Sequence, residues 1–144
     1  MRKITVLSFL FFFFSGYCFS QTVNNVIVTI EITNVVTNGG KIYLTIFSTA
    51  EKFKNGTPDF SFTLEDNNSI VSKELSLPVG EYVISAFQDA NNNRSLDYGL
   101  FGAPKELVGL SNYIGKGYPS KYFDKQKVLI NSMTGKIVIG LYKF

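Results

Sequence analysis

Apolar and polar residues alternate along most of this chain, and a period of two is typical of β-strands. In the first such stretch, Val26, Val28, Ile30 and Ile32 fall on one side. The pattern predicts seven strands, at residues 26–32, 42–47, 60–64, 70–77, 82–87, 128–130 and 137–142. Longer helical periodicity is missing, and only residues 49–55 are expected to form a helical turn.

Turn residues separate these stretches. Asn38-Gly39-Gly40 is a strong turn signal, and Met133-Thr134-Gly135 is expected to join the last two strands as a closing pair. The strand at 42–47 is apolar on both faces, which indicates a central position in a sheet. The pattern therefore predicts an all-β fold: a single antiparallel β-sandwich of about seven strands, immunoglobulin-like or prealbumin-like, with one long ordered loop.

That loop is expected between Asp89 and Lys127, where the strand signal is weak. Loops of this length in a compact domain are usually functional or disordered. This one is rich in Tyr and Phe, which disordered linkers usually lack. We therefore expect it to be ordered and packed on one end of the sandwich.

The first twenty residues have the layout of a secretory signal peptide. Two basic residues precede an apolar run at residues 6–14, which is too short to span a bilayer. Cys18 and Ser20 lie three and one before an expected cut ahead of Gln21, and Tyr17 before Cys18 argues against a lipid anchor. The predicted organisation is a leader at 1–20 and one β-sandwich domain at 21–144, exported to the periplasm or the medium.

The charge balance changes once the leader is set aside. Removing it leaves 12 Lys and Arg against 11 Asp and Glu, with no basic block of the kind that binds nucleic acid. The mature chain has no further apolar run of membrane length, so no transmembrane segment is expected. It also lacks cysteine, so its stability must come from its core, with or without a bound ion.

The stretch from Asp89 to Asp97 carries the clearest chemical pattern. Oxygen-bearing side chains occupy its first, third, fifth, seventh and ninth positions, which are Asp89, Asn91, Asn93, Ser95 and Asp97. Calcium prefers several oxygen ligands converging from one short loop, and this spacing is similar to the first nine positions of an EF-hand loop. The pattern predicts a calcium site of low affinity.

Two positions depart from the EF-hand pattern. Arg94 stands at the sixth position, where glycine normally makes the turn, and Leu100 stands at the twelfth, where glutamate is expected. Glu106 is a candidate to replace that glutamate. The alternative is that Asp and Asn side chains only make Asx-turns in an exposed connection.

Catalytic patterns are sparse, so a non-catalytic protein is expected. The chain has no histidine, which excludes Ser-His-Asp and Cys-His systems and histidine-built zinc sites. A hydrolase using two carboxylates, for example Asp97 and Glu106, is the one enzymatic alternative. Surface charges or ion ligands explain these residues more simply.

Aromatic side chains suggest a second binding function. Tyr113, Tyr118, Tyr122 and Phe123 lie among lysines in the long loop. Such rings can stack on sugars or hold a peptide, so a cell-envelope glycan or protein is a candidate partner. The alternative is that they cover the open end of the sandwich.

Four motifs occur in order along the mature chain: Leu77-Pro-Val-Gly-Glu-Tyr82, Asp89-x-Asn-x-Asn-x-x-x-Asp97, Gly102-Ala-Pro-Lys-Glu106 and Gly109-Leu-Ser-Asn112. With them the chain resembles the small exported bacterial proteins in family twenty-one forty-one of the domains of unknown function. The resemblance implies a periplasmic or secreted β-sandwich and no particular activity. The first motif also resembles the strand entry of prealbumin-like and carboxypeptidase-regulatory-like sandwiches, which bears on fold alone.

Export from a bacterial cell should remove the leader, so that the released protein begins at Gln21. The intact mass of the exported protein measures this. Phe12→Asp, which places a charge in the apolar run, should leave the full 144-residue chain inside the cell, whereas Phe12→Leu should be processed normally. An exported protein that keeps residues 1–20 would contradict the assignment.

Overall fold

The structure is a computed structural model that describes residues 24–144, so the expected leader lies outside the described residues. Eight strands are present in this part of the chain: β1 (Asn25–Thr33), β2 (Ile42–Phe47), β3 (Phe60–Leu64), β4 (Ile70–Pro78), β5 (Gly80–Gln88), β6 (Leu107–Leu110), β7 (Val128–Ile130) and β8 (Lys136–Gly140). Helices are short: α1 (Ala50–Asn55), the 3₁₀ turn η1 (Leu100–Gly102) and α2 (Phe123–Gln126).

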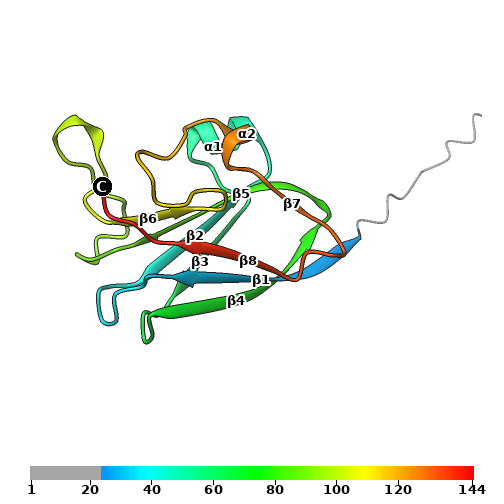
Figure 1. Ribbon diagram of the computed structural model, residues 1–144, viewed down its shortest axis with the longest axis horizontal. Helices are drawn as coiled ribbons and strands as arrows, with labels where there is room; N and C mark the ends of the chain where they lie inside the picture. Colours follow the sequence, from blue (N-terminus) through cyan, green and yellow to red (C-terminus); the bar gives the residue numbers. More distant parts are fainter. Residues whose placement is uncertain (1–23) are drawn as a thin grey trace, which may run out of the picture.

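The strands form two sheets that face one another (Figure 1). The smaller sheet has the order β4-β1-β8, and the larger has the order β3-β2-β5-β6, with β7 also paired to β5. β2 lies between β3 and β5, so its predicted central position is confirmed. The all-β, two-sheet architecture predicted from the alternation is likewise confirmed.

Alternation explains how the core forms. Ile30 and Ile32 of β1 point inward from the smaller sheet, and Leu44 and Ile46 of β2 point inward from the larger one. All four side chains are fully buried, and each such burial stabilises the fold by about 1.5–3 kcal/mol. The inward faces of both sheets therefore make one continuous core.

The prediction of a purely antiparallel sandwich is wrong for the smaller sheet. β1 pairs with β8 in parallel, with Thr29 opposite Lys136 and Thr33 opposite Gly140. The predicted closing pair is wrong for the same reason, because β7 pairs with β5 in one sheet while β8 joins the other. The turn between them carries the chain across the core, where Ile139 of β8 is fully buried.

The prediction of a strandless segment between Asp89 and Lys127 is also wrong. β6 lies inside it and extends the larger sheet along the C-terminal half of β5. Its sequence signal is weak because it has four residues and one is Gly109. That glycine is needed where it stands, because a Cβ there would collide with the carbonyl of Gly140.

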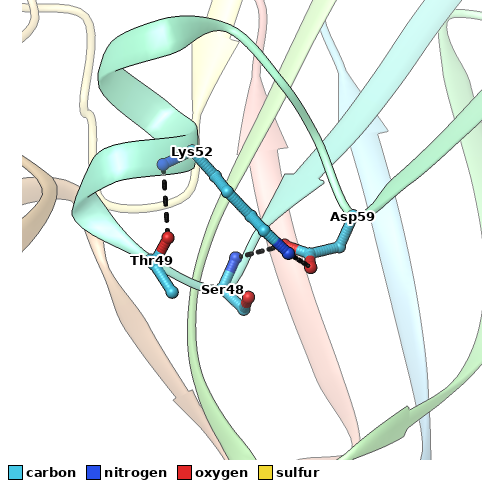
Figure 2. Close-up of polar contacts among 4 residues, drawn as sticks. All are labelled: Ser48, Thr49, Lys52 and Asp59. Carbon is cyan, nitrogen blue, oxygen red and sulfur yellow. Dashed lines mark hydrogen bonds and ion pairs between the residues drawn. The ribbon is translucent and has the colours of Figure 1, made fainter.

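The predicted helical turn at 49–55 is confirmed as α1, and a polar cluster fixes it to the start of β3 (Figure 2). Asp59 accepts hydrogen bonds from the backbone N–H of Ser48 at 2.7 Å and from the ammonium of Lys52. The N-cap is Thr49, whose hydroxyl accepts from the Lys52 N–H at 3.2 Å. Burial acts to raise the pKa of Asp59, but the bonds from Lys52 and Ser48 outweigh it and hold the pKa below the ordinary 3.8.

Asp59→Asn should lower the free energy of unfolding at pH 7 by about 1–3 kcal/mol, because it removes a charged acceptor shared by two donors. A lowered folded-state pKa stabilises the fold above the unfolded value of 3.8, and this contribution is lost as pH falls through the lower folded value. Urea unfolding of both proteins at pH 7 and pH 3 measures the difference, which should be smaller at pH 3.

The matched control is Asp124→Asn, which removes an exposed carboxylate paired with Lys127 at 3.0 Å. Exposed pairs contribute about 0–1 kcal/mol, so this variant should unfold close to wild type at both pH values. Equal losses in the two variants would contradict the role given to Asp59.

Candidate functional site

The candidate site begins where β5 ends. The N–H of Asp89 donates to the carbonyl of Lys41 at 2.8 Å, which continues the pairing of β5 with β2 by one step. Gly40 lies so close that a Cβ there would collide with the carbonyl of Asp89. Asp89 is consequently held at the end of the larger sheet, with 0% of its surface exposed.

The buried carboxylate of Asp89 closes the loop that follows it. Its oxygens accept hydrogen bonds from the N–H of Asn93 at 3.2 Å and the N–H of Arg94 at 2.7 Å. A buried carboxylate is costly unless its oxygens are satisfied, and here the turning backbone supplies the donors. The loop is thus folded around its first residue.

The backbone of Arg94 has the conformation that the EF-hand comparison requires of its sixth position. Its φ is 65°, in the left-handed region that normally favours glycine. Asn92, two residues earlier, also has a positive φ of 59°. Arg94 therefore differs from the expected glycine in its side chain, while its φ lies in the region that glycine favours.

Three of the predicted ligand side chains meet at one point. The amide Nδ2 atoms of Asn91 and Asn93 donate to Oδ2 of Asp97, at 2.6 and 2.9 Å. The amide oxygens accept from the backbone instead: Oδ1 of Asn91 from the Asn93 N–H at 3.2 Å, and Oδ1 of Asn93 from the Ser95 N–H at 2.8 Å. The predicted Asx-turns are thus present, and the side chains at the third, fifth and ninth positions of the loop converge.

Glu106 reaches the loop from the residue before β6. Its side chain is 5% exposed, and its two oxygens accept from the N–H groups of Ala90 at 2.9 Å and Asp97 at 3.3 Å. It thus joins the two ends of the loop. Both of its oxygens accept backbone donors, as both oxygens of Asp89 do.

The donor set fits a hard cation chemically. Asp89 and Asp97 supply carboxylates, and Asn91 and Asn93 supply amide oxygens that a rotation of each amide turns toward Asp97. In the structure the two Nδ2 groups donate to Asp97 from the positions where the amide oxygens would otherwise face a bound cation. Within residues 24–144, no group of three or more His, Cys, Asp or Glu side chains comes together as a metal cluster.

The predicted aromatic ligand residues do not form one surface. Tyr113 and Tyr118 stack on Phe144, with ring centroids 5.8 and 5.5 Å away, so the C-terminal ring lies between two tyrosines. Burial raises the pKa of the Tyr113 hydroxyl, as does the nearby Tyr142. These contacts make Tyr113 part of a small packed cluster.

Phe123 belongs to a different cluster. It meets Phe53 of α1 edge-on at 6.5 Å, and Phe53 meets Phe47 of β2 at 5.4 Å, so these rings fix both helices to the larger sheet. Tyr122 is exposed beside them. The structure therefore separates Tyr113 and Tyr118 from Tyr122 and Phe123.

One supporting residue had no role assigned from the sequence. Gln88, the last residue of β5, is buried, and its amide bonds the N–H and carbonyl of Val36 and the carbonyl of Gly40. These bonds fix the turn at residues 36–40, whose Gly40 lies against the backbone of Asp89. A glutamine at an inward-facing strand position is the signal that could have revealed it.

Comparison with known proteins identifies the family. The model of a family described as "Uncharacterized protein conserved in bacteria (DUF2141)" matches residues 30–142, which is most of the chain, and the predicted resemblance is confirmed. No curated protein matches the chain, and no solved structure does. Among residues 24–144, no helix is long and apolar enough to cross a membrane.

Glu106→Gln should lower the free energy of unfolding by about 1–3 kcal/mol, because the amide keeps one acceptor and brings its NH₂ against a backbone donor. Glu74→Gln is the control, since Glu74 is exposed on β4; it should change stability by less than about 0.5 kcal/mol. Urea unfolding compares the two. A Glu106 variant as stable as the control would show that the loop ends do not need this carboxylate.

Proposed function

The chain belongs to this bacterial family. From its own residues we propose that it is an exported, non-catalytic β-sandwich module whose Asp89–Asp97 loop binds calcium. The observation that carries the proposal is the convergence of Asn91 and Asn93 on Asp97, in a loop that closes on the carboxylate of Asp89. The leader-like sequence and the absence of cysteine from residues 21–144 support a place outside the cytoplasm. Immunoglobulin-like or prealbumin-like topology is part of the proposal, allowing for the parallel β1–β8 pair.

Calcium in this loop replaces one set of partners with another. The Asn amides rotate so that their oxygens join Asp97 and Asp89 around the ion, and the backbone donors that they release turn to water. Glu106 already joins the loop ends at Ala90 and Asp97, so the ligands stay near one another without the ion. With two formal charges in the loop, the dissociation constant should be about 10⁻⁴–10⁻³ M.

The role that fits this site is stabilisation of a binding surface. An ion that binds the folded loop and not the unfolded chain adds RT ln(1 + [L]/Kd) to the free energy of unfolding. The loop leads directly into residues 98–104, which project from the sandwich (Figure 1). Calcium therefore serves to order one end of the module rather than to carry out a reaction.

A glycan- or peptide-binding module is the second candidate, and one observation favours it. Tyr118 stacks on Phe144 with an interplanar angle of 14°, and it is exposed. A flat ring held by stacking and open on its other face is suited to a sugar. Since Tyr122 and Phe123 lie in another cluster, this surface is smaller than the sequence indicated.

Calorimetric titration of the protein with calcium should show one site with a dissociation constant of about 10⁻⁴–10⁻³ M. Calcium at tenfold that constant should add about 1.4 kcal/mol to the free energy of unfolding and raise Tm relative to chelator. Asp97→Asn should abolish the heat while keeping an acceptor for both Asn amides. Asp89→Ala should abolish it too, with a further loss of stability.

Asp124→Asn is the matched control and should bind as wild type, because it removes one exposed carboxylate away from the loop. Absence of heat at millimolar calcium, with equal Tm in calcium and chelator, would rule out the ion site. Equal binding by wild type and Asp97→Asn would place the ion elsewhere and have the same consequence for this loop.

A further inference from the structure

Residues 98–104 form a small hairpin that projects beyond the ends of the strands, drawn yellow-green in Figure 1. The N–H of Gly99 donates to the carbonyl of Ala103 at 2.7 Å, and Tyr98 bridges to Pro104. At its base, the N–H of Lys105 donates to the carbonyl of Asp97 at 2.8 Å. The projection is thus a hydrogen-bonded structure fixed to the loop of Asp89–Asp97.

Two large apolar side chains occupy its tip. Leu100 is 86% exposed, and Phe101 beside it is fully exposed. Phe101 has a φ of 72°, a left-handed conformation that is unfavourable for a bulky residue. The backbone at Phe101 is therefore strained while both side chains stay in water, so no burial of apolar surface within the chain offsets the cost of this conformation.

The base of the hairpin is basic. The side chain of Lys105 runs along the hairpin past Gly99, with its Cγ and Cε each 3.9 Å from where a Cβ on that glycine would lie. Lys105 and Lys143 line a cavity of about 210 Å³ together with Glu106, Val36 and Leu107. Neither lysine belongs to an ion pair within residues 24–144.

Of the charged side chains at this base, the two lysines are exposed, whereas the carboxylates are buried or partly buried. Asp89 and Glu106 are buried, and their oxygens accept backbone N–H groups. Asp97 is only partly exposed, and its Oδ2 holds two Asn amides. An approaching surface meets an apolar tip with ammonium groups behind it.

The size and shape of this feature decide between partners. A stable protein interface covers about 800 Å² on each side, far more than one convex tip of two residues offers. A bilayer interface accepts such a tip, since shallow insertion of apolar side chains needs no matching pocket. Tyr98 at the start of the hairpin is half exposed, and tyrosine is favoured at headgroup depth.

From these observations we propose that the hairpin at residues 98–104 docks this end of the protein on an anionic lipid surface. Leu100 and Phe101 enter the acyl boundary, Tyr98 lies at headgroup level, and Lys105 and Lys143 face the lipid phosphates. The inference does not depend on calcium binding, because the apolar tip and the two lysines are present without an ion.

The absence of tryptophan from the chain gives a direct test. Phe101→Trp places a single fluorescent reporter at the tip. Met133→Trp places one in the turn before β8, away from the hairpin, where Met133 is 88% exposed. With vesicles of one part phosphatidylglycerol to three parts phosphatidylcholine at low salt, the emission of the first variant should shift to the blue. The second should not shift.

Vesicle sedimentation then measures the contribution of each group. Leu100→Ser with Phe101→Ser should lower partitioning at least about tenfold, while Met133→Ser leaves it unchanged. Lys105→Gln and Lys143→Gln should each cost about fivefold on anionic vesicles and nothing on pure phosphatidylcholine. Lys54→Gln, an exposed lysine on α1, is the charge control.

Each assay is run in calcium and in chelator, which separates this proposal from the ion site. A blue shift in chelator supports docking whether or not calcium binds. No shift and no sedimentation in either condition would overturn the proposal, as would equal partitioning of wild type and the double Ser variant. A shift at both Trp positions would overturn it too, since adhesion would then be unspecific.

Discussion

A carboxylate without solvent contact stands at the end of β5, and the geometry of one end of this protein follows from its needs. Asp89 cannot be hydrated by bulk water, so the chain after it turns back and presents N–H groups to its oxygens. This requirement explains the left-handed residues that follow, which aim consecutive donors at one side chain. The next residues then have little freedom, and Asn91, Asn93 and Asp97 are brought together within the same loop.

β5 transmits this arrangement to the rest of the fold. Along one side it pairs with β2, and along the other it pairs first with β7 and then with β6. Glu106 stands immediately before β6, so the strand that completes the sheet also delivers the carboxylate that joins the loop ends. The same pairing sets the register of the sheet and the position of the site.

The alternation of apolar and polar residues is enough to predict the strands that have one inward face. The spacing of the Asp and Asn side chains is enough to predict the loop that brings them together. It could not predict partners. Ile137 and Ile139 signal a buried face equally well beside β7 or beside β1, so the parallel β1–β8 pair was invisible. The pattern does not predict β6, because Gly109 interrupts its apolar residues. A glycine is required there by the close approach of Gly140, a residue distant in sequence. The split of the aromatic residues depends in the same way on Phe144 and Phe53, whose positions are fixed by tertiary packing.

The two proposed sites share a residue, and this has a thermodynamic consequence. Asp97 is a ligand in the proposed ion site. Its carbonyl accepts from the N–H of Lys105 at the base of the hairpin, and its own N–H donates to Glu106. An ion that restricts Asp97 restricts the base of the hairpin as well, which lowers the entropy lost when the tip enters a lipid surface. Coupling between two binding sites is reciprocal. The factor by which a bound ion raises the affinity for lipid must therefore equal the factor by which bound lipid raises the affinity for the ion. A site with the proposed dissociation constant of about 10⁻⁴–10⁻³ M changes its occupancy most over that range of calcium concentration, so the proposed coupling would strengthen lipid docking there without being required for it.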